Sequence, residues 1–108
     1  MEQINKILRY NALLDIYQNL LSKTQKEILI DYFNYDLSLS EIASNRNVSR
    51  AAVEDAILKG IKKMESFESE LKLFEKRNAI INHLDVIKEN AHDKKVVLKA
   101  VEEIEKNL

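Results

Sequence analysis

Apolar residues in the first third of the chain recur at three- and four-residue steps, which is the spacing of amphipathic helices. They predict a first helix over residues 2–21, with an apolar stripe wide enough to be covered on more than one side. Ser22 and Gln25 then have the spacing of a capping box, which satisfies free backbone N–H groups at a helix start. A second helix is therefore expected to begin after Ser22 and to end near Asn34.

The stretch from Ser38 to Ile57 carries two helix starts close together. Ser38 and Glu41 form a further capping-box pair. Asn47 belongs to the few residue types that tolerate the left-handed conformation with which helices often end. Ser49 can cap another helix directly after it. Two helices joined by a three-residue turn are the layout of a helix-turn-helix.

From Arg50 the apolar pattern continues without an obvious stop as far as Asn90, which predicts a long fourth helix. At 1.5 Å per residue, a helix of that length would span about 60 Å, which is long for a small domain. Two alternatives follow. The helix breaks near residues 66–69 or at Asn78, or it projects and is covered by something else.

The clearest late break lies before Asp93, which can cap a short C-terminal helix. Proline is absent and Gly60 is the only glycine, so the chain offers almost no turn chemistry for β-hairpins. The expected fold is all-α: a five-helix helix-turn-helix domain with a long fourth helix and a short C-terminal helix. We expect a single domain over residues 1–108, with the helix-turn-helix at 38–57 and a helical extension at 58–108.

The predicted fourth helix carries a loose heptad of apolar residues, a pattern typical of paired helices. One row holds Ile57, Met64, Leu71 and Asn78, and the other holds Gly60, Phe67, Phe74 and Ile81. Either this stripe forms a dimer interface through Met64, Phe67, Leu71 and Phe74, or the first and last helices fold back and cover it. The length of the stripe favours a homodimer.

Enzymatic chemistry has little support in the residues. The chain has no cysteine and no glycine-rich loop that could cradle phosphate, and His83 and His92 lack the spacing of a helical metal site. We therefore expect no enzyme and no cofactor. No apolar run is long enough to span a bilayer and the N-terminus lacks a signal-peptide pattern, so a cytoplasmic protein without membrane insertion is expected.

Nucleic-acid contact is expected from the helix that starts at Arg50, whose first residues would face a groove. The candidate contacts are the basic residues Arg46, Arg50, Lys59, Lys62 and Lys63. Glu54 and Asp55 on the same helix oppose this interpretation, as does the net charge of −1. The residues therefore leave open a nucleic-acid-binding protein and a helical bend that serves only protein contacts.

Four short segments of the first 75 residues share their order and spacing with one family. They are Asn11-Ala12-Leu13-Leu14-Asp15 with Tyr17, Leu20-Leu21-Ser22 with Gln25, Asp36-Leu37-Ser38-Leu39-Ser40-Glu41-Ile42-Ala43, and Val48-Ser49-Arg50 with Ala52-Val53 and Asp55. In these segments the chain resembles the YlxM family of small bacterial helix-turn-helix proteins, itself similar to the fourth region of sigma factors. Three positions depart from that pattern: Asn47 replaces a turn glycine, Ala51 a common glutamine, and Glu54 an aromatic residue or histidine.

The resemblance implies a non-enzymatic accessory protein. The family is usually encoded beside the GTPases of the signal recognition particle and is suspected to act in that targeting pathway or to regulate it. The implied partners are the particle's protein, its receptor, or its small RNA, which a basic face would contact by shape and phosphate. A DNA-binding transcriptional regulator is the alternative.

Overall fold

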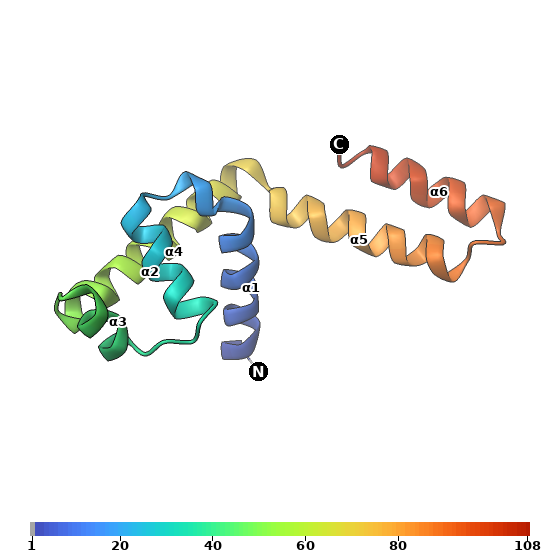
Figure 1. Ribbon diagram of the computed structural model, residues 1–108. Coiled ribbons are helices and arrows are strands. Elements are labelled where there is room, and N and C mark those ends of the chain that lie inside the picture. The colour runs from blue at the N-terminus through green and yellow to red at the C-terminus, as the bar shows by residue number, and fades with distance from the viewer. Residues whose placement is uncertain (1) are drawn as a thin grey trace. The chain divides into compact units, whose positions relative to one another are not determined.

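The computed structural model describes the backbone of residues 2–108 and the side chains of residues 5–108. The chain divides into two compact units, residues 1–71 (unit 1) and 72–108 (unit 2), which are described separately. The described residues form six α-helices and one short 3-10 helix, with no β-strand among them (Figure 1). The all-α prediction is therefore confirmed, and the helix count of five is wrong. The prediction of a single domain stays a prediction.

Unit 1 is built from four α-helices. They are α1 (Glu2–Tyr17), α2 (Lys23–Phe33), α3 (Leu39–Arg46) and α4 (Arg50–Leu71), with the 3-10 helix η1 (Gln18–Leu20) between α1 and α2. The predicted first helix thus ends as a 3-10 turn. Ser22 caps α2 as expected, because its hydroxyl oxygen accepts a hydrogen bond from the Gln25 backbone N–H at 3.2 Å.

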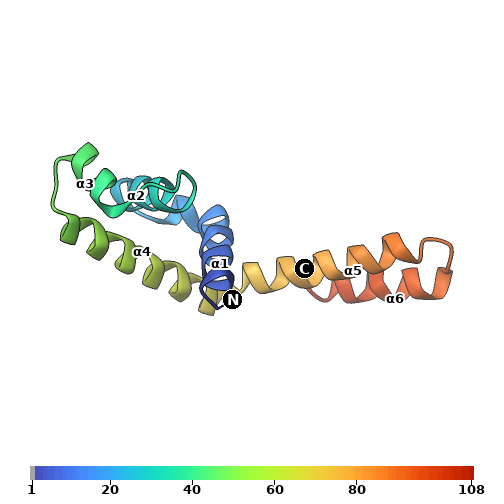
Figure 2. The same cartoon turned by 90° about the horizontal axis from the view of Figure 1, so that it is seen from below.

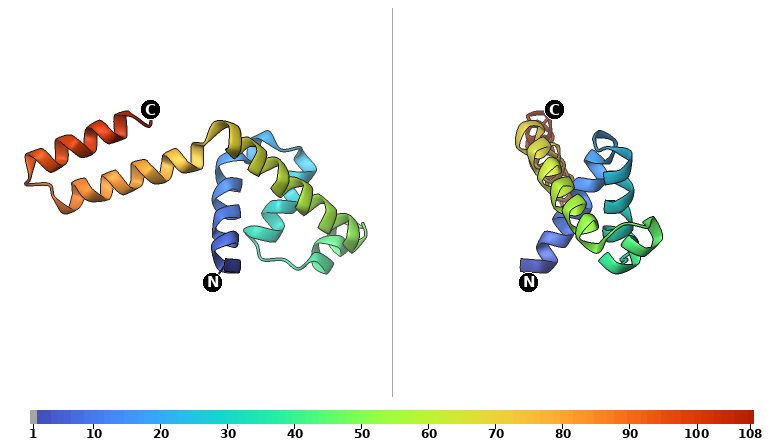
Figure 3. Two further views of the ribbon diagram at one scale, coloured as in Figure 1. Left: turned by 180° about the vertical axis from the view of Figure 1, so that it is seen from behind. Right: turned by 90° about the vertical axis from the view of Figure 1, so that its left-hand side faces the viewer.

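The core of unit 1 lies along α4, against which α1, α2 and α3 all pack (Figure 3). Its completely buried side chains are Leu13, Leu14, Tyr17, Leu29, Ile42, Val53 and Met64. Gly60 lets α2 and α4 approach closely, since a Cβ atom at Gly60 would lie 2.6 Å from Cδ1 of Leu29. The close packing of α2 against α4 therefore depends on the absence of a side chain at Gly60.

The long fourth helix does not exist as predicted. Helix α4 ends at Leu71, Lys72 adopts a left-handed conformation with φ 56° and ψ 29°, and α5 (Leu73–Glu89) begins directly after it. The break falls neither at residues 66–69 nor at Asn78. A lysine gives no sequence signal for a left-handed residue, since that conformation is routine only for glycine and occasional for asparagine and aspartate.

Unit 2 is a helical hairpin of α5 and α6 (Lys94–Glu105), which lie side by side in Figures 1 and 2. The predicted late break and cap are confirmed. Asp93 caps α6, because its Oδ1 accepts a hydrogen bond from the backbone N–H of Val96 at 3.3 Å. None of the helices in the described part of the chain is long and apolar enough to cross a membrane.

Candidate nucleic-acid interface

The helix-turn-helix predicted over residues 38–57 is present as α3 and α4, which are joined by a short loop (Figure 2). Ser38 and Glu41 form both bonds of the capping box, each at 3.1 Å. Ser49 starts α4, since its hydroxyl oxygen accepts a hydrogen bond from the Ala52 backbone N–H at 3.0 Å. Both helix starts therefore form as their local sequence predicts.

The turn between α3 and α4 is a Schellman motif. Asn47 has φ 56° and ψ 44°, the left-handed conformation expected of it. Its backbone N–H donates to the carbonyl of Ser44 at 3.3 Å, and that of Val48 donates to the carbonyl of Ala43 at 3.0 Å. Asparagine thus supplies the left-handed conformation that glycine most often supplies at the end of a helix.

Arg46, which was predicted as a nucleic-acid contact, joins α3 to α2. Its Nη1 donates to Oε2 of Glu27 at 3.0 Å and its Nη2 to Oδ2 of Asp31 at 3.3 Å. Burial opposes the charge of the guanidinium, but these two hydrogen bonds raise the pKa of Arg46 above its ordinary value. Because only 26% of its side chain is exposed, we leave Arg46 out of the candidate contact surface.

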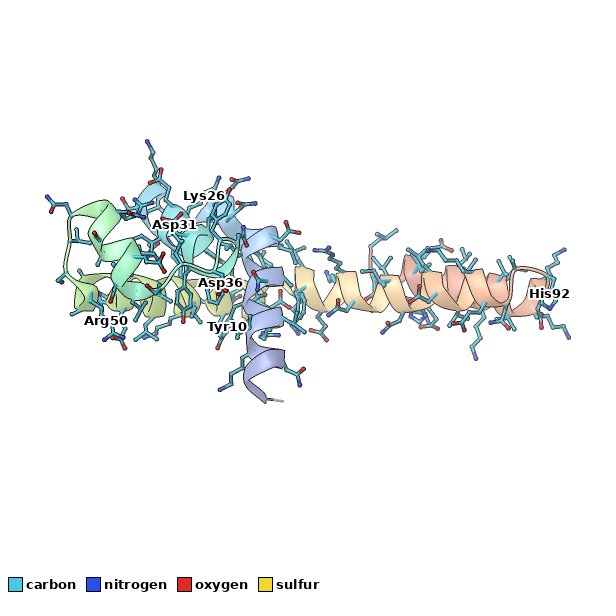
Figure 4. The ribbon with its side chains drawn as sticks, turned by 60° about the horizontal axis from the view of Figure 1, so that its bottom comes forward. Tyr10, Lys26, Asp31, Asp36, Arg50 and His92 are labelled. Atoms are coloured by element: carbon cyan, nitrogen blue, oxygen red, sulfur yellow. The ribbon has the colours of Figure 1, made fainter. Side chains whose placement is uncertain are left out.

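Arg50 and Lys62 are the basic residues of α4 that are most available to a ligand. Both are exposed, and neither has an ion-pair partner among the residues that the structure describes. Arg50 stands at the first turn of α4, on the outside of unit 1 (Figure 4). The turn therefore presents an unpaired guanidinium where a helix-turn-helix meets its target.

The other two predicted lysines of α4 have neighbours within the helix. Nζ of Lys59 lies 2.9 Å from Oδ2 of Asp55, and both side chains are mostly exposed. Nζ of Lys63 lies 6.0 Å from the ring centre of Phe67. Such exposed contacts are weak and break readily. Residues 50–63 carry four basic and two acidic groups, so this part of α4 has a charge of +2.

The two acidic residues near the start of α4 differ in their surroundings. Asp55 is paired with Lys59. Glu54 is exposed, lies one helical turn after Arg50 on the same side of α4, and lines a cavity of about 260 Å³ together with Ile7 of α1 and Tyr32 of α2. The pairing of Asp55 reduces its part of the objection to polyanion binding, whereas the Glu54 carboxylate stays near Arg50.

Sequence reasoning missed this cavity and a second one of about 370 Å³, which shares Ile7, Tyr32 and Phe33 with it. We call the two together the acidic-rimmed groove, because the charged residues lining it are Asp36, Glu41 and Glu54. The one available signal was Leu58, an apolar residue outside the predicted core stripe. It lines the groove and is 60% exposed.

Two polar contacts hold α1 against α4. Arg9 makes a bidentate ion pair with Glu65, from Nε to Oε1 at 2.8 Å and from Nη2 to Oε2 at 2.7 Å. These bonds to Arg9 lower the pKa of Glu65 below its ordinary value. Deeper in unit 1, the hydroxyl of the buried Tyr17 donates to Oε1 of the buried Glu68 at 2.6 Å.

The four predicted dimer residues do not form one exposed row. Met64 is completely buried in unit 1, so it offers no surface to a second chain. Phe67 is half-buried, with its ring centre 5.9 Å from that of Tyr17. Leu71, at the end of α4, is 45% exposed, and Phe74 is half-buried and belongs to unit 2.

Residues 4–104 match the family model of UPF0122, described as "Putative helix-turn-helix protein, YlxM / p13 like". The chain belongs to the UPF0122 family. A UPF0122 protein of Fusobacterium nucleatum is 44% identical over 87 residues, covering 81% of this chain and 84% of that protein. A UPF0122 protein of Mycoplasma mycoides is 38% identical, covering 94% of this chain and 89% of that protein. A UPF0122 protein of Bacillus thuringiensis is 37% identical, covering 95% of this chain and 97% of that protein.

Membership of UPF0122 confirms the resemblance found in the first 75 residues and extends it. The matched range includes all of α5 and nearly all of α6, so unit 2 belongs to the family pattern as much as the helix-turn-helix does. The family is described by its helix-turn-helix, and the geometry of α3 and α4 agrees with that description.

Proposed function

We propose that this UPF0122 protein is a non-enzymatic regulatory protein that binds nucleic acid through α4. The surface is the α4 basic strip, which we define as Arg50, Lys59, Lys62 and Lys63. The single observation that carries the proposal is the unpaired Arg50 at the first turn of the second helix of a well-formed helix-turn-helix.

The chemistry of the strip favours phosphate contact over base reading. Ala51 is too short to form a hydrogen bond with a base edge, and Glu54 lines the groove with α1 and α2. Arginine and lysine side chains bind phosphate without regard to sequence. A structured RNA, recognised by shape and backbone, therefore suits this surface better than a specific DNA sequence.

The family resemblance narrows the proposal to the signal recognition particle pathway. We propose the particle's small RNA as the ligand, with this chain as an accessory factor to the particle's GTPases. The alternative ligand is duplex DNA, in which case the protein would be a transcriptional regulator.

A titration at two salt concentrations tests the proposal. If the strip neutralises about four phosphates, the logarithm of affinity falls with a slope of about −3.6 against the logarithm of salt, which is a loss of about 10²-fold between about 50 mM and 200 mM. Fluorescence anisotropy with labelled particle RNA and with a labelled DNA duplex would measure the affinity for each nucleic acid at both salt concentrations. No binding of either nucleic acid at the lower salt concentration would rule the function out.

Matched charge reversals test the surface itself. We expect Arg50→Glu with Lys62→Glu to abolish binding without unfolding the chain, because both side chains are exposed and unpaired. The control is Lys76→Glu with Lys95→Glu, which makes the same change in net charge at exposed positions of unit 2. Equal loss of affinity in the two double variants would show that binding follows total charge rather than the strip.

The acidic-rimmed groove supports a second candidate function, a protein-interaction module. Its apolar lining fits the apolar face of a helix, and its three acidic residues favour basic flanks on that helix. The proposed occupant is therefore a basic amphipathic helix of the particle's protein or of its receptor. In calorimetric titrations with each purified protein, we expect Leu58→Asp to abolish binding, whereas Leu20→Asp, an exposed leucine outside the groove, should leave it unchanged. Binding unaffected by Leu58→Asp would refute the groove as the site.

A further inference from the structure

Unit 2 lacks a core of its own. Among its described side chains only Ala100 is buried, although α5 and α6 pack along each other. Chains shorter than about 40 residues usually need a disulfide, a metal or oligomerisation to stay folded. The chain has no cysteine, and the described residues contain no cluster of metal-binding side chains. Packing of its apolar residues against a surface outside the hairpin would supply the missing core.

One side of the hairpin carries apolar residues of both α5 and α6, whereas the exposed Ile81, Val86 and Leu98 lie elsewhere on it. His83 and Ala100 mark the contact between the two helices, since both line the small cavity between them. Leu84 follows His83 in α5, and Val101 follows Ala100 in α6. One residue along an α-helix corresponds to a rotation of about 100° about the helix axis. In an antiparallel pair this rotation turns both side chains to the same face, and both are exposed, by 42% and 39%.

The spacing on this face is that of interlocking helix bundles. In α5 the apolar residues Ile80, Leu84 and Ile87 follow steps of four and three. In α6 and the residues after it, Val97, Val101, Ile104 and Leu108 follow steps of four, three and four. Such seams interlock with seams of the same spacing on partner helices, as in four-helix bundles.

We propose that a second copy of this chain covers the hairpin face, so that two hairpins form a four-helix bundle across a two-fold axis. An isologous contact needs one patch that complements itself, and the two seams provide the same spacing on both chains. Helices α5 and α6 have 17 and 12 residues, so they are about 25 Å and 18 Å long and, at about 10 Å width each, present about 430 Å² in projection on each chain. Before the corrugation by side chains is counted, the two faces together approach the roughly 1,000 Å² of total buried area that a specific interface needs.

The proposed interface is independent of nucleic-acid binding and differs from the row expected from the sequence. It uses the seams of α5 and α6, whereas Met64 and Phe67 contribute to unit 1. The distinction is testable, because changes in the hairpin should affect dimerisation while the core of unit 1 stays intact.

Light scattering over a range of protein concentrations provides the test. We expect the full chain to have twice its monomer mass of 12.6 kDa, and Leu84→Asp with Val101→Asp to be monomeric. The control is Leu20→Asp with Tyr35→Asp, two exposed residues of unit 1 outside the acidic-rimmed groove, which should stay dimeric. A wild-type chain that is monomeric at several hundred micromolar overturns the proposal, as does a double hairpin variant that stays dimeric.

Loss of folding can be separated from loss of the interface. The milder variant Leu84→Lys changes a single seam residue whose side chain is already 42% exposed, so the hairpin should keep its helices while the dimer weakens at least tenfold. Coupling of folding to association also requires the melting temperature of the wild type to rise with protein concentration. If Leu84→Lys dimerises as tightly as the wild type and the melting temperature does not change with concentration, the hairpin face is not the interface.

Discussion

We predict that replacing Gly60 by alanine destabilises unit 1, although alanine is the better helix former. Gly60 is buried where α4 crosses α2. A Cβ atom there would lie 2.6 Å from Cδ1 and 3.2 Å from Cγ of Leu29, whereas carbon atoms in favourable contact are about 3.5–4.0 Å apart. Because Leu29 is completely buried, its methyl group has no solvent into which to move.

Two opposing effects set the magnitude for Gly60→Ala. Alanine in a helix interior is favoured over glycine by about 1 kcal/mol. Extra carbon in a packed core costs about 1–3 kcal/mol, and an overlap of about 1 Å at a buried leucine belongs at the upper end of that range. We therefore expect the free energy of unfolding to fall by about 1–2 kcal/mol.

Urea unfolding followed by tyrosine fluorescence is the appropriate assay for unit 1. The four tyrosines, Tyr10, Tyr17, Tyr32 and Tyr35, all lie in residues 1–71, so their signal does not report on unit 2 directly. The midpoint and slope of each transition yield the free energy of unfolding.

A double-mutant cycle isolates the clash as the cause. In a Leu29→Ala background the added methyl group of Gly60→Ala finds a cavity, and only the helix preference remains. The same substitution should then stabilise unit 1 by about 1 kcal/mol. If Gly60→Ala instead stabilises the otherwise unchanged chain, helix propensity dominates and the reasoning about the crossing is wrong.

Three further predictions concern polar contacts of unit 1. Tyr17→Phe removes the hydroxyl that donates to the buried Glu68 and should cost about 1–3 kcal/mol in urea unfolding. Asn47→Ala places an unfavoured residue in the left-handed turn and should cost about 1 kcal/mol, whereas Asn47→Gly should cost nothing in the same assay. Glu65→Gln should lower stability by at most about 1 kcal/mol at pH 7, because its pair with Arg9 is more than a third exposed. Since the folded state lowers the pKa of Glu65, the difference from wild type should vanish as the pH falls through that lowered pKa.

Matched controls separate these contacts from general effects of substitution. Tyr35→Phe removes the hydroxyl of a tyrosine that is 69% exposed and should change the stability little. Glu70→Gln removes an exposed carboxylate of the same helix as Glu65 and should change the stability little. A pH-independent loss for Glu65→Gln would mean that the ion pair with Arg9 contributes nothing.

The residues at which several helices begin were predictable from the sequence. Ser22, Ser38, Ser49 and Asp93 each cap the helix predicted after them. Such a cap needs only one side chain and a backbone N–H three residues later, so a short stretch of sequence contains all the information. The helix-turn-helix and the family resemblance rest on the same kind of local spacing.

The break at Lys72 and the availability of the basic residues were not predictable in this way. Lys72 has a left-handed conformation, which a lysine does not signal in the sequence. The apolar pattern therefore predicted one continuous helix across this position. Arg46 looked as free as Arg50 in the sequence, but Glu27 and Asp31 reach it from α2. These partners lie 19 and 15 residues away along the chain, beyond the range of any helical periodicity.

Sequence alone was thus sufficient for an all-α chain, for a helix-turn-helix at residues 38–57, and for the family. Only the tertiary structure could decide which basic side chains of α4 lack an ion-pair partner, that Met64 is buried in the core of unit 1, and that the acidic-rimmed groove exists. The reason is physical. Caps and turns are made by residues near each other in the chain, whereas burial, ion pairing and cavities depend on which helices meet, and that meeting is set by packing over the whole unit.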